Sequence, residues 1–369
     1  MRVAVFGAGV IGKLRSASVV DNGRTELVAV ADVDEGRARA AATGSGAAIF
    51  TDYRAAIAAG PLDAVIVSSP VHLHEEMCLA AFQAGCHVLC EKPLSNSLES
   101  CRRIAAAAAA AGKTLAVGFN LRYYPAVKYL TDVIQRGVIG KIDHVRVFGG
   151  HDGLAGFRAD WMYKSALSGG GAMMDVGIHT TDLVNHVAGD VVEVSGIATG
   201  SIWNVEGSED NAIAVMRTAR DIPVIYQATW TEWKGYKTSI EVYGELGMVS
   251  AQYAPMSNLL ITHDKPGGKR KRTTKLYPEI ILREKLKGWE TTTRITFDEE
   301  LEDFLKMIAG EQVRLAAASA RSRWRRQSTS RRASTVRSRC RSREERGDSD
   351  GGRRDHDLRP APVGRPHRG

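Results

Sequence analysis

Long apolar runs are missing from this 369-residue sequence. No stretch reaches the ~18 consecutive apolar residues of a membrane-spanning helix, so we expect neither a transmembrane segment nor a membrane partner. The first residues, MRVAVFGAGVIG, are too few and too rich in glycine for a signal peptide and predict a β-strand instead. With 44% hydrophobic and 25% charged residues, the composition is ordinary for a globular protein of two domains. We expect a cytoplasmic protein.

Cysteine is scarce, and no two cysteines form a C-x-x-C pair. The five cysteines are Cys78, Cys86, Cys90, Cys101 and Cys340. Four of them fall in one predicted α/β region, where reduced thiols are the expected state. We therefore expect no metal site.

Lysine is absent from residues 312–369, which contain 17 Arg and 6 acidic residues, a net charge of +11. Subtraction leaves 33 basic and 36 acidic residues in 1–311, a net charge of −3, so no nucleic-acid partner is expected for this body. The tail has no apolar period of 2 or 3.6 and is predicted to be disordered. Its abrupt loss of lysine favours a segment translated out of frame. A genuine basic arm that binds nucleic acid is the alternative.

Residues 1–120 alternate short apolar runs with helical patterns, which predicts a doubly wound parallel sheet, an α/β domain. The predicted strands are RVAVFG, ELVAVAD, DAVIVSS, HVLCEK and TLAVGF. Their nearly continuous apolar character is typical of strands covered by helices on both faces.

Residues 121–311 follow another pattern, which predicts an α+β domain with a largely antiparallel sheet. A helical stretch, YPAVKYLTDVIQRGVIG, precedes strand-like segments that alternate polar and apolar residues. The basic stretch 265–275 between two such segments predicts a solvated hairpin, with a phosphate-binding loop as the alternative.

The segment GAGVIG follows the first strand and opens a helix. Its glycines permit a tight turn, close approach of a pyrophosphate and close packing of helix on strand. The predicted cofactor contacts here are Gly7, Gly9, Val10, Ile11 and Gly12. Asp32, at the end of the second strand, is placed to accept hydrogen bonds from the ribose and to repel a 2′-phosphate, so NAD is favoured over NADP. A glycine turn without a ligand is the alternative.

Two further strand ends carry polar residues at the edge where open α/β sheets bind ligands. In SSPVHLHEE, Ser69 and Pro70 are predicted cofactor contacts, and His74 either lines the nicotinamide pocket or caps the next helix. In CEKPL, Glu91 and Lys92 are predicted cofactor contacts and precede a proline that stiffens the turn. Lys92 either points at the ligand or is a surface lysine.

In GGGAMMDVGIHTTDLV, Asp175 and His179 stand four residues apart in an apolar stretch. Helical spacing places them on one face, one turn apart. They could form a structural core pair, or part of a metal site for which no convincing third ligand is evident. The third interpretation is a proton-transfer site, in which the carboxylate orients the imidazole.

The order of these motifs resembles the Gfo/Idh/MocA family of NAD(P)-dependent oxidoreductases, over roughly residues 1–310. The resemblance implies a Rossmann domain, a second domain that mediates assembly into a homodimer or homotetramer, and a catalytic set of Lys92, Asp175 and His179. It also suggests Arg122 and Tyr124 as substrate contacts. Val71 departs from the asparagine of many members, and the arginine-rich tail replaces their closing helical segment.

The function implied is NAD-dependent hydride transfer to or from a secondary alcohol of a sugar or cyclitol, such as an inositol. His179 would take the hydroxyl proton, Lys92 would stabilise charge on the reacting oxygen, and Asp175 would bind an adjacent hydroxyl. A non-catalytic NAD-binding regulator and an NAD-dependent glycosidase are the alternatives.

Overall fold

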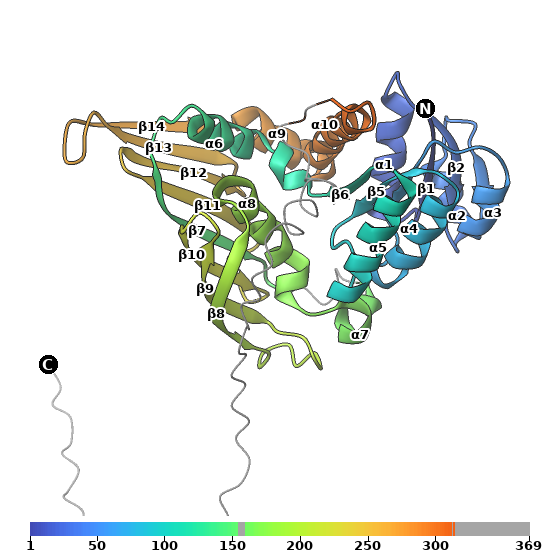
Figure 1. Cartoon of the computed structure of the whole chain (residues 1–369), viewed down its shortest axis with the longest axis horizontal. Helices are drawn as coiled ribbons and strands as arrows, with labels where there is room; N and C mark the ends of the chain where they lie inside the picture. The colour runs from blue at the N-terminus through green and yellow to red at the C-terminus, as the bar shows by residue number, and fades with distance from the viewer. Residues whose placement is uncertain (154–158, 312, 314–369) are drawn as a thin grey trace, which may run out of the picture. The chain divides into compact units, whose positions relative to one another are not determined.

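The computed structural model of the chain describes residues 1–153, 159–311 and 313. Figure 1 shows the ribbon with its elements labelled. The predictions made for the tail concern residues that, Val313 apart, lie outside the described part of the chain.

The first sheet has six parallel strands in the order β3-β2-β1-β4-β5-β6. This order confirms the predicted doubly wound sheet, in which ligands bind outside the carboxyl ends of the strands. The strands are β1 (Arg2–Phe6), β2 (Glu26–Ala31), β3 (Ala48–Phe50), β4 (Ala64–Val67), β5 (His87–Glu91) and β6 (Leu115–Gly118).

Helices connect these strands. They are α1 (Val10–Asp21), α2 (Glu35–Ala41), α3 (Tyr53–Ala58), η1 (Val71–Leu73), α4 (His74–Gln83) and α5 (Leu98–Ala111). The alanine-rich α5 begins where the Ser97 side chain accepts the Ser100 N–H, and it ends at Gly112 in the left-handed conformation. Strong intrinsic propensity and both caps explain why this stretch is helical.

The second sheet has eight strands in the order β14-β13-β12-β11-β7-β10-β9-β8. All neighbours are antiparallel except β7 and β10, so the predicted, largely antiparallel sheet is confirmed. The strands are β7 (Ile142–Gly150), β8 (Val191–Thr199), β9 (Asn211–Thr218), β10 (Pro223–Thr229), β11 (Lys237–Gly244), β12 (Gly247–Tyr253), β13 (Ser257–His263) and β14 (Arg270–Leu276).

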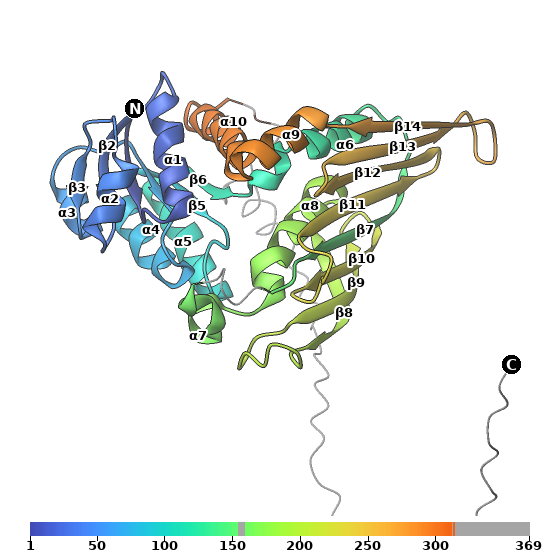
Figure 2. The ribbon, with the colours of Figure 1, turned by 180° about the vertical axis from the view of Figure 1, so that it is seen from behind.

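Helices cover one face of this sheet, as the two views of the ribbon show (Figures 1 and 2). Helix α6 (Pro125–Gln135), helix α8 (Ile178–Ala188) and the turn η5 (Met173–Gly177) pack on it. The other short helices of this part of the chain are η2 (Asn120–Tyr123), η4 (Asp160–Tyr163) and α7 (Ser165–Ser168). Burial alternates along strand β9. Ala214 and Met216 are buried beneath the helices, whereas Ile213 and Val215 are exposed on the other face of the sheet.

The last two helices of the described chain are α9 (Pro278–Lys287) and α10 (Glu290–Ile308). Helix α10 returns to the first sheet, where Leu301, Phe304 and Leu305 are buried in one apolar cluster with Val3 and Leu89. The first domain therefore depends on residues from near the end of the described chain.

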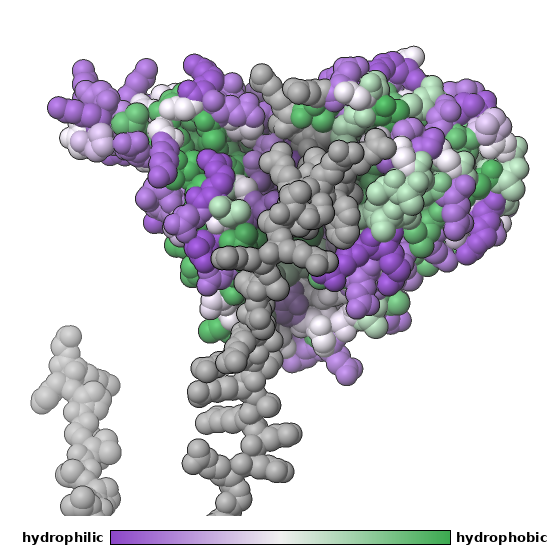
Figure 3. Space-filling view, in the orientation of Figure 1, coloured by the Kyte–Doolittle hydropathy of each residue, from purple (hydrophilic) through white to green (hydrophobic). Residues whose placement is uncertain are grey.

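Residues 265–275 fall in the β13–β14 hairpin, whose exposed second strand makes the tip hydrophilic (Figure 3). Cys78, Cys86, Cys90 and Cys101 are free thiols. Within the described part of the chain, no helix combines the length and the apolar character needed to cross a membrane.

Candidate active site

The glycine turn between β1 and α1 is packed too closely for side chains at two of its positions. Gly7 has a φ of +88°, and a Cβ there would lie 2.5 Å from the Ser69 nitrogen. A Cβ on Gly12 would lie 1.8 Å from the Gly7 carbonyl oxygen. Gly9 differs, because an added Cβ would meet no protein atom within 4 Å. It is the N-cap of α1, so open space lies where a helix N-terminus favours phosphate.

Asp32 follows β2 and holds the glycine turn. Its Oδ2 accepts the Ala8 N–H at 2.7 Å, and its Oδ1 accepts an Arg37 Nη2 hydrogen at 2.9 Å. Arg37 lies on α2, and its half-exposed side chain reaches back to Asp32. The carboxylate that would meet the ribose is therefore partly neutralised by an arginine.

His74 connects two loops at the carboxyl edge of the first sheet. Nδ1 lies 3.0 Å from the Pro93 carbonyl oxygen, and Nε2 lies 2.8 Å from the Ser69 carbonyl oxygen. Burial lowers the pKa of this imidazole. Since both ring nitrogens face protein carbonyls, a contribution of His74 to cofactor binding would pass through the loops it joins.

Lys92, directly after β5, reaches the second domain. Its Nζ donates to the backbone carbonyl of Asp175 at 3.1 Å. The preceding Glu91 accepts hydrogens from the Arg15 guanidinium, at 2.8 Å from Nε. The structure thus brings the E-K-P lysine against the D-x-G-x-H segment, 83 residues later in the chain.

Asp175 lies in a π-helical turn, η5, rather than in the regular α-helix that the spacing predicts. Looser winding changes the angle between residues four apart in the chain, but the Asp175 charge still acts on the His179 imidazole. The Asp175 Oδ2 accepts hydrogens from His151 Nε2 at 2.8 Å and Trp230 Nε1 at 3.0 Å. Because the Gly153 N–H donates to His151 Nδ1 at 3.0 Å, the Nε2 of a neutral His151 carries the proton.

The glycines of this motif allow close packing around η5. A Cβ on Gly177 would lie 2.2 Å from the Tyr226 hydroxyl, and one on Gly171 would lie 2.1 Å from the Glu209 carbonyl oxygen. The Glu209 carboxylate caps the turn, accepting the N–H groups of Gly171 at 3.0 Å and Met173 at 2.7 Å. Glu209 therefore holds the backbone of the turn that carries Asp175, while His151 and Trp230 hold its carboxylate.

His179 opens the α-helix that follows and is almost fully buried. Burial, and then the positive charge of Lys92, hold its pKa well below the ordinary value, with the Asp175 charge acting in the opposite direction. Its Nδ1 is buried with no hydrogen-bond partner among the described residues. The ring meets the edge of Phe119, with centroids 6.2 Å apart. His179 is therefore a neutral imidazole beside the lysine.

Arg122 and Tyr124 are placed in the interior. Arg122 donates through Nε to Asp182 at 2.6 Å, in a buried ion pair. The Tyr124 hydroxyl lies 3.3 Å from the Thr293 hydroxyl, and its ring centroid lies 4.9 Å from that of Tyr253. Both engage protein groups, and their role as substrate contacts stays a prediction.

The sequence did not point to His151, Trp230 or Glu209. The first two lie 24 and 55 residues from Asp175 in the chain and meet it only because β7 and β10 are neighbours. Across the described residues, no three His, Cys, Asp or Glu side chains are grouped to hold a metal ion.

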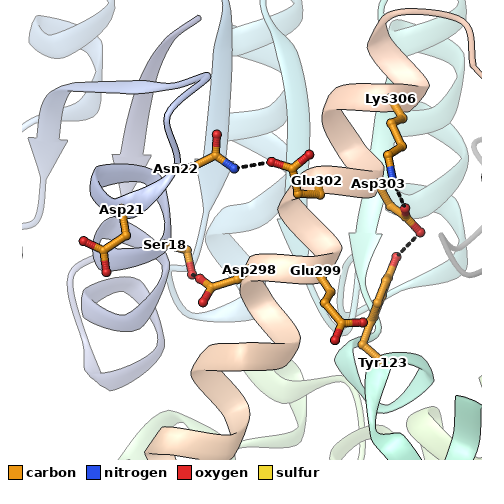
Figure 4. Close-up of a pocket in the computed structure, with 9 residues that line it drawn as sticks. All are labelled: Ser18, Asp21, Asn22, Tyr123, Asp298, Glu299, Glu302, Asp303 and Lys306. Atoms are coloured by element: carbon orange, nitrogen blue, oxygen red, sulfur yellow. Dashed lines mark hydrogen bonds and ion pairs between the residues drawn. The ribbon is translucent and has the colours of Figure 1, made fainter.

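A separate hollow lies between α1 and α10 (Figure 4). It is lined by acidic side chains of α10, which are paired with neighbours: Asp298 with Ser18 at 2.6 Å, and Glu302 with Asn22 at 2.6 Å. These contacts dock the two helices and lie apart from the Lys92 site.

Comparison with known proteins agrees with this geometry. The profile described as "Oxidoreductase family, NAD-binding Rossmann fold" matches residues 1–119, and that of the GFO/IDH/MocA C-terminal domain matches residues 127–250. Myo-inositol 2-dehydrogenase of Thermotoga maritima is 29% identical over 314 residues, 84% of this chain and 88% of the relative. 1,5-anhydro-D-fructose reductase of Ensifer adhaerens is 31% identical over 239 residues, 64% of this chain and 70% of the relative.

Among solved structures, levoglucosan dehydrogenase in complex with NADH and levoglucosan superposes with a TM-score of 0.75. It is 23% identical, and the match covers 87% of this chain and 92% of that one, a likeness of fold. With both of its domains matched, the chain belongs to the Gfo/Idh/MocA family of NAD-binding oxidoreductases.

Proposed function

We propose that this protein is an NAD-dependent dehydrogenase that interconverts a secondary alcohol and a ketone on a sugar or cyclitol. The observation that carries the proposal is the 3.1 Å contact between Lys92 Nζ and the Asp175 carbonyl. It joins an amine at the cofactor edge of the first sheet to the segment that holds a buried carboxylate and a neutral histidine.

The glycine turn supports a dinucleotide. Gly9 leaves open space at the N-terminus of α1, whereas the other two glycines are required by the packing of the turn itself. We assign the diphosphate to this turn and the adenosine ribose to Asp32. When bound, NAD supplies the hydride acceptor.

Arg37 reduces the expected preference for NAD over NADP. The Asp32 carboxylate repels a 2′-phosphate, but the Arg37 guanidinium beside it offsets part of that repulsion. We propose NAD as the preferred cofactor, with a preference smaller than a lone aspartate would give. The ratio of kcat/KM for the two cofactors measures it.

Side chains of this protein would accept the hydroxyl proton and stabilise the negative charge on the reacting oxygen. A ring nitrogen of neutral His179 accepts the hydroxyl proton as the carbonyl forms, which avoids a charged intermediate. The Lys92 ammonium donates a hydrogen bond to the reacting oxygen and stabilises its negative charge. The Asp175 carboxylate, oriented by His151 and Trp230, accepts a hydrogen bond from a neighbouring hydroxyl.

The substrate class follows from this donor set and from the relatives. Several adjacent hydroxyls are needed to use an ammonium, an imidazole and a carboxylate at once, which favours polyols. Relatives named inositol 2-dehydrogenase and D-glucoside 3-dehydrogenase support a cyclitol or sugar.

We also propose that a second copy covers the open face of the eight-stranded sheet. Ile197, Ile213, Val215 and Ile225 are all at least half exposed there, on three neighbouring strands. A contiguous apolar face of this kind is typical of an interface. A homodimer or homotetramer would bury it.

The test is NADH formation by the purified chain with NAD and a panel of inositols, aldoses and sugar phosphates. We expect turnover with at least one cyclitol or sugar. A folded chain that binds NAD and turns over none of them would contradict the proposal and favour a non-catalytic regulator, while release of free sugar from a glycoside would indicate the glycosidase.

A further inference from the structure

Arg15, buried in α1, lies between two carboxylates. Its Nη2 lies 2.6 Å from Glu91 Oε1 and 2.6 Å from Glu300 Oε2, and its side chain is only 1% exposed. The guanidinium carbon sits 3.6 Å from the centroid of the Phe297 ring. Both Phe297 and Glu300 belong to α10, so the last described helix holds a side chain of the first.

The end of β6 leaves room for this cluster. A Cβ on Gly118 would lie 2.9 Å from Arg15 Nη2 and 3.0 Å from Glu91 Oε2. Any larger residue at this position would press on the ion pair. The cluster is thus part of the close packing at the carboxyl edge of the sheet, next to the proposed cofactor site.

Glu91 connects the cluster to Lys92. While Arg15 holds Oε1, Oε2 accepts the backbone N–H of Lys92 at 3.3 Å. The same carboxylate therefore fixes the start of the turn from which the Lys92 side chain extends toward Asp175. A shift of Glu91 moves the backbone that carries the amine.

A second cation faces Glu300 from η2. Arg122 pairs with Asp182, which lies three residues after His179 on α8. The ionisable groups around Glu300 are Arg15, Glu91, Arg122 and Tyr123. Burial, and then the Glu91 charge, raise the pKa of Glu300 to about 7 against the opposing pull of the two arginines.

Contacts other than those of the Glu300 carboxylate also hold helix α10 on α1. Ser18 bonds Asp298 and Asn22 bonds Glu302 at the helix surface, as Figure 4 shows. Buried leucine and phenylalanine side chains add to the contact. A change at Glu300 can therefore alter the cluster while the helix stays in place.

We propose, on the basis of the proposed function, that Glu300 is a positioning residue for Lys92: through Arg15 and Glu91, helix α10 sets where the lysine amine lies. The active arrangement is the one with Glu300 ionised. A protonated Glu300 keeps its shape but no longer balances the Arg15 charge, and the Glu91–Lys92 turn relaxes.

The first experiment compares Glu300→Gln with the wild type and with a control variant, Glu299→Gln. Glu299 also lies on α10, and its substitution alters only a part-exposed ion pair with Lys128 of α6. A misplaced amine lowers kcat, by about tenfold at pH 8, with KM for NAD little changed. The wild type and Glu299→Gln should lose activity as pH falls through about 7, the pKa of Glu300. Glu300→Gln should lack this step.

A second readout needs no substrate. The rate at which Lys92 is methylated by formaldehyde and a hydride donor, measured by peptide mass spectrometry, should change at least about threefold in Glu300→Gln and not in Glu299→Gln. This keeps the two proposals separable. If the wild type oxidises no polyol, the proposed function fails, and the labelling still decides whether Glu300 acts on Lys92.

Equal pH profiles and equal Lys92 labelling in Glu300→Gln and the wild type would overturn the proposal. If Glu300→Gln does not fold, Arg15→Lys takes its place, since a lysine keeps the charge but lacks the fork that joins both carboxylates. The same changes in pH profile and labelling would then support the proposal, and their absence would refute it.

Discussion

At the scale of single residues, the charge of Lys92 acts on His179. It is the second cause, after burial, of the lowered pKa of that imidazole. We therefore expect Lys92→Ala to raise the pKa of His179, because a nearby like charge disfavours the imidazolium. Titration of the histidine Cε1 protons by NMR measures the shift, with His179→Asn identifying the signal.

His186 is the internal control for this titration. Burial, together with the Arg122 charge, lowers its pKa to about 4, and Lys92 is not among the causes. Its titration should be the same in both proteins. A His179 signal that titrates identically with and without Lys92 would contradict an effect of the Lys92 charge on this imidazole.

A substitution at Gly9 should affect cofactor binding without affecting the stability of the fold. Its φ of −64° suits alanine, and an added Cβ meets no protein atom within 4 Å. We expect Gly9→Ala to keep the wild-type melting temperature and to weaken NAD binding about tenfold or more, because the methyl group occupies the approach of the diphosphate.

Calorimetric titration with NAD measures this effect, and Gly23→Ala is the matched control. Gly23 also has open space around its Cβ position, at the far end of α1. Unchanged NAD affinity in Gly9→Ala would mean that the diphosphate lies elsewhere.

At the scale of elements, the π-helical turn η5 depends on its cap. Glu209 supplies both carboxylate oxygens to N–H groups at the start of the turn. We expect Glu209→Ala to lower the free energy of unfolding by about 1–2 kcal/mol, since it removes charge-assisted bonds at a helix N-terminus. Urea denaturation measures the loss.

Glu206→Ala is the control for that measurement. Glu206 lies in the same connection between β8 and β9 but is exposed. Equal losses of stability in the two variants would show that the cap contributes nothing specific. A drop in kcat for Glu209→Ala alone would place the cap in the support of Asp175.

The elements were largely predictable because local patterns determine them. Five of the six parallel strands and the alternating strands follow from periodicity, whereas the three-residue β3 was too short to be predicted. The site was predictable only in part. Lys92, Asp175 and His179 stand in recognisable motifs, whereas His151 and Trp230 reach Asp175 through the pairing of β7 with β10. No pattern near either residue signals that pairing.

The π turn and the buried ion pairs were also not predictable from local sequence patterns. A spacing of four residues predicts a regular helix, and nothing in the local sequence signals the π turn that holds Asp175. Arg122 forms an ion pair with Asp182, 60 residues away in the chain, which no local pattern signals. Arg15 meets Glu300 across 285 residues, a contact that local sequence does not encode.

At the scale of the whole molecule, the proposed assembly depends on the open face of the second sheet. Strand β9 presents Val215, which is 60% exposed, between exposed apolar residues of its neighbours. We expect Val215→Asp to reduce the oligomer to a monomer of 40.0 kDa, because an unpaired carboxylate in the interface costs too much to bury.

Light scattering after size-exclusion chromatography measures the mass. Leu286→Asp, at an exposed apolar position on α9, is the matched control and should leave the assembly unchanged. A wild-type protein that is already monomeric, or a Val215→Asp protein that keeps the wild-type mass, would contradict assembly through this face.

We propose that an amine on the first domain and a carboxylate and imidazole on the second act together on one alcohol. NADH formation by Lys92→Ala tests this, with folding and NAD binding verified, beside Lys141→Ala as a surface control. We expect Lys92→Ala to lose at least about a thousandfold in kcat while Lys141→Ala keeps wild-type turnover, as expected for loss of a group that stabilises developing charge. Wild-type turnover by Lys92→Ala would show that the three groups do not act together.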